Sequence, residues 1–201
     1  KYINYLNNNI KYVDRPLWNK KIKVNLNKNK DFIYSIKGYP WGKIYSRSVW
    51  NNVRFPVGFD YEDTIIQLII FRIAKRYVYI PNLVYRYTYN SNSITNKLKK
   101  NIKCLDSYYV IEALIKENYN LNLEFDYQFY RLILIHLGKL LYSRTKNMDP
   151  LITDAILVKA SELLKNIDDK SPEKLNIIEK YLKKSIIDKN KEKWKICCKY
   201  M

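Results

Sequence analysis

Three carboxylates lie within four positions of this chain, in the segment Phe59-Asp60-Tyr61-Glu62-Asp63. The first hundred residues contain only two other acids, Asp14 and Asp31, so the cluster stands out in a strongly basic region. Apolar residues follow it and predict a buried helix over 63–76, whose free N-terminal N–H groups and dipole favour an ionised carboxylate. Such a carboxylate accepts the proton of a bound hydroxyl, so the cluster is a candidate for general-base catalysis.

A purely structural interpretation of the same cluster stays open. Asp60 as an N-cap, with Asp63 three residues later, is also an ordinary way for a helix to begin. Spacing alone favours this second interpretation, so the surrounding sequence has to decide between capping and catalysis.

Length and composition exclude several classes of protein. The 201 residues are 47% hydrophobic and carry a formal net charge of +18, which is enough apolar material for a packed core and excludes global disorder. No apolar run reaches the roughly 20 residues that a membrane-spanning helix needs. Three cysteines without a CxxC pair and a single histidine, His136, argue against a zinc site, and no metal ligand is predicted. His136 lies in an apolar segment, so we expect it to be buried and not catalytic.

The elements that must position the acid cluster change character near residue 95. Before it, residue patterns predict a short helix through Ile3, Leu6 and Ile10 and strands over 22–26, 77–80 and 84–89. After it, they predict helices over 98–113, 125–144, 150–167 and 172–187, and a capping residue followed by proline begins each of the last two. We therefore predict the α/β class, with a mixed domain over 1–95 and an all-helical subdomain with a basic tail over 96–201.

Five short motifs follow one another along residues 39–95. They are W-G-K-I-Y-S-R from Trp41, F-P-V-G-F-D-Y-E-D ending at Asp63, Y-I-P from Tyr79, Y-R-Y from Tyr85 and N-S-I-T from Asn92. Their order and spacing resemble the C-terminal half of family 2 glycosyltransferases. These are inverting enzymes of the GT-A fold that use nucleotide sugars in the synthesis of bacterial capsule, lipopolysaccharide and exopolysaccharide. The resemblance implies that 1–95 is the acceptor-side part of a GT-A-like domain of a hexosyltransferase.

The resemblance also implies a role for each matching residue. Asp63 is expected to be the general base that deprotonates the acceptor hydroxyl, and Glu62 beside it to orient the acceptor or tune the base. Four further residues are expected to bind substrate: Trp41, Lys43, Asp60 and Arg86. The face of the Trp41 indole suits a sugar ring, and Lys43 suits a phosphate. A buried aromatic residue beside a turn, and a solvated lysine, are the alternative interpretations of these two positions.

Two features depart from the family pattern. Thr88 stands where many relatives carry a His or Arg that reaches the diphosphate, with Arg86 two residues earlier on the same strand face. The D-x-D motif that holds Mg²⁺ or Mn²⁺, and the nucleotide-binding half that ends in it, are missing ahead of Trp41. The resemblance thus implies a metal-dependent full-length enzyme whose acceptor-side part is this chain, inactive alone.

The implied partners are a nucleotide-sugar donor and a glycan or lipid-linked acceptor. A cytoplasmic location is expected, which the odd number of cysteines also favours, with peripheral contact to the inner membrane face through the basic tail 189–201. The alternative function is a non-enzymatic basic module that binds nucleic acid or an anionic membrane surface. Because the lysines are spread along the chain and no nucleic-acid-binding motif is present, no specific nucleic acid is expected.

Overall fold

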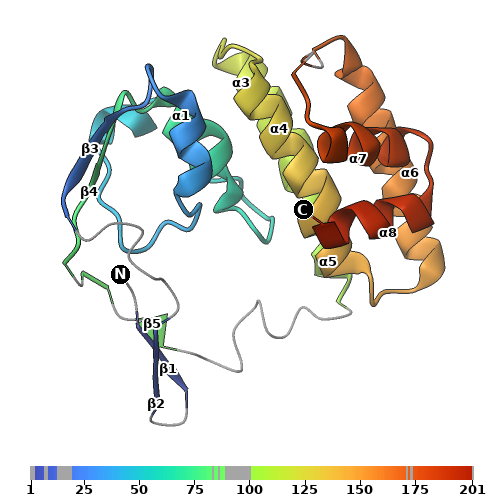
Figure 1. The fold of residues 1–201 in the computed structure, drawn as a ribbon, viewed down its shortest axis with the longest axis horizontal. Coiled ribbons are helices and arrows are strands. Elements are labelled where there is room, and N and C mark those ends of the chain that lie inside the picture. Colours follow the sequence, from blue (N-terminus) through green and yellow to red (C-terminus); the bar gives the residue numbers. More distant parts are fainter. Residues whose placement is uncertain are drawn as a thin grey trace. The chain divides into compact units, whose positions relative to one another are not determined.

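The computed structural model describes residues 3–6, 9–12, 20–82, 84–85, 87–88, 101–170, 172 and 174–200 (Figure 1). Contacts divide the chain into a mixed unit, Lys1–Phe55 with Ile65–Lys97, and a helical unit, Pro56–Thr64 with Leu98–Met201. The division after Lys97 falls close to the boundary expected after residue 95. Residues 56–64, however, pack with the helical unit, so the loop that carries the acid cluster belongs to the second unit and not to the first.

Two small sheets form the strand part of the mixed unit. β3 (Ile22–Asn25) and β4 (Arg76–Tyr79) pair antiparallel, with Ile22 opposite Tyr79. β1 (Ile3–Leu6) lies between β2 (Asn9–Tyr12), to which it is antiparallel, and β5 (Tyr87–Thr88), to which it is parallel. Two 3-10 helices, Lys30–Ser35 and Arg47–Trp50, complete this unit together with the helix that follows the acid cluster.

The helix expected through Ile3, Leu6 and Ile10 is wrong, because these residues lie in β1 and β2. The segment is rich in asparagine, which has a low helix propensity. Ile3 and Tyr5 pair with Tyr12 and Ile10 across the two strands. Isoleucine and tyrosine also have high strand propensities, and the backbone pairing of β1 with β2 outweighs the coincidental helical spacing.

The helix after the acid cluster is confirmed as a buried one. It runs over residues 64–73, with a π-helical segment, Ile66–Ile70, that continues into α1 (Phe71–Ile73). Ile65, Ile66 and the consecutive residues Leu68, Ile69 and Ile70 are at most 1% exposed. Burial of consecutive residues means that apolar side chains surround the helix on most faces, as the sequence predicted.

After residue 101, the regular elements in the described part of the helical unit are all helical (Figure 1). In chain order they are a 3-10 turn (Ile102–Leu105), α3 (Asp106–Asn120), α4 (Tyr127–Ile135), a π-helical segment (His136–Leu140), α5 (Leu141–Thr145), α6 (Pro150–Asn166), a 3-10 turn (Asp168–Lys170), α7 (Ile177–Ile187) and α8 (Lys191–Tyr200). α4, the π segment and α5 are continuous and make one long helix over 127–145.

Capping residues decide where two of these helices begin. Asp149 accepts a hydrogen bond from the Leu151 N–H at 2.8 Å, with Pro150 in the first turn, so the predicted start of α6 is confirmed. The predicted start of the next helix near Pro172 is wrong. Asn176 and Glu179 form a reciprocal capping box, and this pair of hydrogen bonds fixes the start of α7 at Ile177 instead.

The basic tail is a packed helix. α8 packs beside α7 and against the π segment, and it buries Trp194 (0% exposed) and Cys198 (Figure 1). Gly138 of the π segment lies so close to Leu182 of α7 that a Cβ on it would stand 2.5 Å from the nearest leucine methyl group. The π segment and α7 therefore pack closely at Gly138.

The fold is a helix-rich mixture of helices and small sheets, which agrees with the predicted α/β class. Within the described ranges, none of the helices has both the length and the apolar character that crossing a bilayer requires.

Candidate functional site

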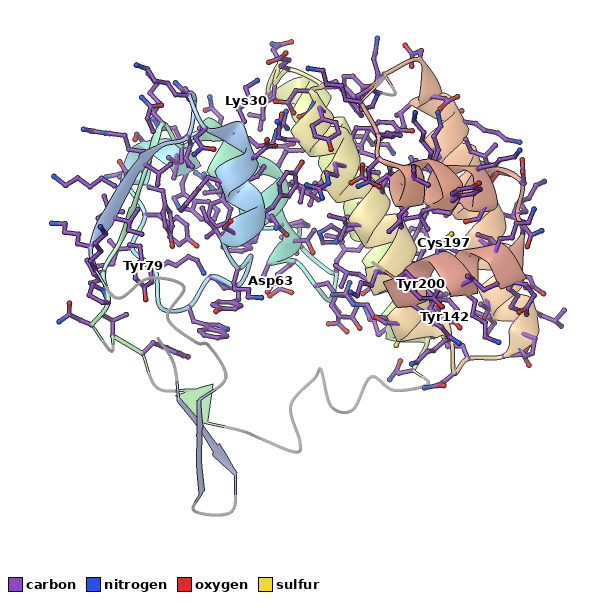
Figure 2. All side chains as sticks on the ribbon, in the orientation of Figure 1. Lys30, Asp63, Tyr79, Tyr142, Cys197 and Tyr200 are labelled. Carbon is purple, nitrogen blue, oxygen red and sulfur yellow. The ribbon has the colours of Figure 1, made fainter. Side chains whose placement is uncertain are left out.

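The acid loop, residues 56–64, brings the three predicted carboxylates to the start of the buried helix. The first helical residue is Thr64, whose N–H donates to the Tyr61 carbonyl at 3.0 Å, so Asp63 directly precedes the helix. Asp60 and Asp63 are half-buried, whereas Glu62 is exposed. Asp63, and not Asp60, therefore occupies the position before the first helical residue (Asp63 is labelled in Figure 2).

The backbone of the acid loop is held by the first turn of α3. The Asp60 N–H donates to Oδ2 of Asp106 at 2.9 Å. Lys103 Nζ donates to the same carboxylate oxygen at 3.1 Å and to the Gly58 carbonyl at 3.2 Å. One carboxylate and one ammonium from residues 103–106 thus fasten two points of the loop.

A second attachment comes from Arg144 in α5. Its guanidinium carbon lies 3.7 Å from the centroid of the Tyr61 ring, and Nη1 donates to Oγ of the buried Ser107 at 2.6 Å. Burial lowers the pKa of Arg144, while the nearby Tyr61 and Asp63 raise it. Because a guanidinium stays protonated at neutral pH, a fixed positive charge lies within electrostatic range of Asp63.

Tyr61 is held as a neutral phenol in a left-handed backbone conformation. Burial raises its pKa to about 12, although the charge of Arg144 acts in the opposite direction. Its φ of 66° is unusual for a residue other than glycine, and such a conformation costs about 1–3 kcal/mol and persists only where its surroundings impose it. The stack on Arg144 is one contact of the Tyr61 side chain, and a hydrogen bond with Cys104 is another.

These surroundings suit a proton acceptor. A positive charge within electrostatic range favours the ionised form of a carboxylate, and the start of a helix adds to this effect. Asp63 is half-buried, so part of it remains accessible. The arrangement is able to hold an ionised carboxylate in a defined position and to expose it to a ligand.

Trp41 and Lys43 belong to the mixed unit, where they build an aromatic turn. The Trp41 ring stacks on Tyr39 with 3.6 Å between centroids and 5° between planes, and on Tyr85 with 5.1 Å and 21°. Lys43 Nζ donates to the Tyr39 carbonyl at 2.6 Å and lies 4.1 Å from the centroid of its ring. Tyr39 therefore covers at least part of the indole face that the sequence assigned to a sugar, and Lys43 helps to close the turn.

Arg86, the remaining predicted substrate-binding residue, lies outside the described residues, as does the side chain of Thr88. His136 is confirmed as buried, at 4% exposure. Burial, with a smaller contribution from the charge of Arg144, lowers its pKa to about 3, so the imidazole is neutral at pH 7. Among the described residues no group hydrogen-bonds to either ring nitrogen.

The residues that sequence reasoning missed are the anchors Lys103, Asp106 and Arg144. They stand some 40–80 positions after the acid loop, and the loop motif itself gives no indication of them.

Within the described ranges, no three His, Cys, Asp or Glu side chains are grouped so that they could hold a metal ion.

Known proteins add no assignment to this geometry. No family model, no curated protein and no solved structure matches the chain.

Proposed function

We propose that this chain is the acceptor-side part of an inverting, nucleotide-sugar-dependent glycosyltransferase of the GT-A fold. The observation that carries the proposal is the acid cluster: Asp63 lies half-buried at the start of a buried helix, within electrostatic range of the charge of Arg144. The ordered motifs from Trp41 to Asn92 support the same reaction class. Neither observation names the donor sugar or the linkage.

In the proposed reaction Asp63 acts on the acceptor. One carboxylate oxygen takes the proton of the acceptor hydroxyl as the hydroxyl oxygen forms a bond to the anomeric carbon of the donor sugar. The bond from that carbon to the diphosphate oxygen breaks, and the nucleoside diphosphate leaves with the electron pair. Attack opposite the leaving group inverts the anomeric configuration. The half-exposed position of Asp63 and the nearby charge of Arg144 fit an ionised, accessible base.

The divalent metal expected for the full-length enzyme does not fit the residues in hand. The described part of the chain offers no group of three acidic, histidine or cysteine ligands, and no D-x-D sequence precedes Trp41. We therefore derive no step through Mg²⁺ or Mn²⁺. The metal and the donor nucleotide belong, in this proposal, to the half of the enzyme that carries D-x-D.

The aromatic turn of the mixed unit is the proposed sugar-binding element. Trp41 is engaged by Tyr39 and Tyr85, and Tyr85 is 37% exposed. A sugar ring stacks its apolar C–H face on an exposed aromatic ring, so Tyr85 is the member of this stack best placed to meet a glycan.

A membrane-bound acceptor remains part of the proposal. α8 buries Trp194 and Cys198, so these two residues are not available to a lipid surface. The exposed residues of this helix that could contact an anionic leaflet are Lys193, Ile196, Lys199 and Tyr200.

The test is sugar transfer by the full gene product that contains this chain. Nucleoside diphosphate release is measured over a panel of nucleotide sugars, with and without glycan or lipid-linked acceptors, and NMR then gives the anomeric configuration of the product. We expect acceptor-dependent release with inversion, its loss in Asp63→Asn, and its retention in Asp154→Asn, which changes an exposed acid paired with Lys191. Transfer that survives Asp63→Asn unchanged would contradict the proposal, as would a product with retained configuration.

A further inference from the structure

The acid loop is held by side chains that make and break no bond in the proposed reaction. Arg144 links three parts of the helical unit. It belongs to α5, donates a hydrogen bond to Ser107 of α3, and stacks on Tyr61 of the loop. Asp63, the candidate base, is two residues after Tyr61 and interacts electrostatically with the same guanidinium. The contacts lie wholly within the helical unit, although the helix that follows the loop belongs to the mixed unit.

From these contacts we propose that Arg144 is the positioning residue of the acid cluster: its guanidinium, fixed by Ser107 and stacked on Tyr61, sets where the Asp63 carboxylate stands. The role rests on the proposed function for its catalytic consequence, but not for its effect on the loop. It also gives the all-helical subdomain a task in the reaction, since α3 and α5 supply the support for the base.

The chemistry of arginine suits this role better than that of lysine. A guanidinium is planar, so it can lie flat on the Tyr61 ring while its edge donates to Ser107, whereas an ammonium group has no plane to stack. The Tyr61 backbone is left-handed (φ 66°) and needs a contact that holds it there. Without the stack, the turn can relax, and relaxation moves the neighbouring Glu62 and Asp63.

Arg131 in the same long helix shows how a purely structural arginine differs. Its Nε donates to Glu179, whose side chain is only 2% exposed, so this carboxylate is closed to any ligand. Arg144 instead stacks on a loop residue, Tyr61, and interacts electrostatically with the half-buried Asp63 of the same loop. Arg131→Lys is therefore the matched control: it makes the same change in the same helix, on a pair that does not touch the acid loop.

The experiment measures loop position and catalysis separately. Hydrogen exchange of the full gene product reports on the amides of Asp60 and Thr64, which donate to Asp106 and to the Tyr61 carbonyl. Arg144→Lys keeps the charge and loses the planar stack; Arg144→Gln keeps a planar end and loses the charge. We expect exchange in 59–64 to rise about ten-fold in each variant, because Arg144→Lys loses the planar stack and Arg144→Gln loses the cation–π contact and the charged hydrogen bond.

Steady-state transfer completes the test. We expect kcat to fall about ten-fold in Arg144→Lys with the donor KM unchanged, because a misplaced base slows only the chemical step. Arg131→Lys should change neither exchange in 59–64 nor kcat, even if it lowers the melting temperature.

Each remaining outcome decides the proposal. Exchange in 59–64 within two-fold of wild type in both Arg144 variants overturns it, whatever the activity. Faster exchange with unaltered kcat overturns the positioning role, because the base then works without the stack. If the wild-type protein transfers no sugar, the proposed function fails, and the exchange measurement alone decides whether Arg144 sets the position of the loop.

Discussion

The two ends of the long helix 127–145 use the same kind of residue for different purposes. Near its start, Arg131 pairs with the buried carboxylate of Glu179, whose side chain is 2% exposed. Near its end, Arg144 stacks on Tyr61 and interacts electrostatically with the half-buried Asp63. An ion pair with a buried carboxylate affects stability, whereas a positive charge that acts on an accessible carboxylate can also affect a reaction. The two arginines therefore differ in the solvent accessibility of the carboxylate that each one interacts with: Glu179 is buried, whereas Asp63 is partly accessible.

The largest expected effect is the loss of kcat when Asp63, the partly accessible carboxylate, is replaced. A general base contributes roughly 10²–10⁴-fold to rate, so Asp63→Asn should lose at least about 100-fold in kcat in the full gene product. Glu62→Gln, next to it and exposed, should lose less, and more of its loss should appear in the acceptor KM. Steady-state transfer by both variants is the measurement, with melting temperatures as the control for folding. Near-normal kcat in Asp63→Asn would mean that this carboxylate only caps the helix.

Removing the ion pair between Arg131 and Glu179 should affect stability alone. Arg131→Met leaves the Glu179 carboxylate buried without its partner, a change that costs about 3–5 kcal/mol in a fully buried pair. Because the Arg131 side chain is 31% exposed, water can partly replace it, and we expect about 2–3 kcal/mol less stability toward urea. Exchange in 59–64 should stay at the wild-type rate under native conditions. A selective increase in that loop would show that the two ends are coupled and would remove the distinction drawn above.

The π segment between the two arginines should give the helical unit a pH dependence. Burial lowers the pKa of His136 from the ordinary histidine value of 6.5 to about 3 in the folded protein. Below 6.5 the unfolded chain binds a proton that the folded chain does not, so stability falls as the pH drops from 6.5 towards 3 and is unaffected by this group above 6.5. Between about pH 7 and about pH 5 the loss should be about 2 kcal/mol.

Urea unfolding of wild type and His136→Leu at both pH values measures this term. The difference in the free energy of unfolding between pH 7 and pH 5 should be smaller by about 2 kcal/mol in the variant, because leucine has no proton to bind. An unchanged difference would mean that His136 is solvated or hydrogen-bonded in the folded protein, in disagreement with its burial.

Much of the fold follows from local sequence. The apolar run after Asp63 predicts the buried helix, because its residues are apolar on most faces. The Asp149-Pro150 pair predicts the start of α6, because both residues act within one turn of the chain. Short elements are less predictable: the spacing of Ile3, Leu6 and Ile10 fits a helix, yet strand pairing decides the outcome.

Only part of the candidate site can be predicted from the sequence, because local sequence does not show contacts between distant residues. The carboxylates of 60–63 are visible as a cluster, whereas their anchors come from α3 and α5, far along the chain. One signal was available: of the eighteen basic residues after residue 100, sixteen are lysines and only Arg131 and Arg144 are arginines. In a chain this rich in lysine, an arginine marks a position that needs a planar, multiply bonded cation, and both arginines do contact a specific partner.

The smallest expected effect concerns the acidic anchor of the loop. In Asp106→Asn the amide oxygen can still accept from the Asp60 N–H, but the charge that attracts Lys103 is lost. The Lys103 side chain is 50% exposed, so solvent screens this attraction, and we expect a loss of less than about 1 kcal/mol that shrinks further at high salt.

Asp169→Asn is the matched control, because it breaks an exposed pair with Lys170 that holds no loop. Urea unfolding at low and high salt, together with exchange at the Asp60 amide, separates the two variants. Asp106→Asn should raise exchange at Asp60 about two- to five-fold, the range expected when a hydrogen bond to a charged group becomes one to a neutral group, and Asp169→Asn should not. If Asp106→Asn instead lost several kcal/mol with no local change at Asp60, Asp106 would resemble Glu179, a stabiliser of the helical unit, and Arg144 would be left as the anchor that distinguishes the acid loop.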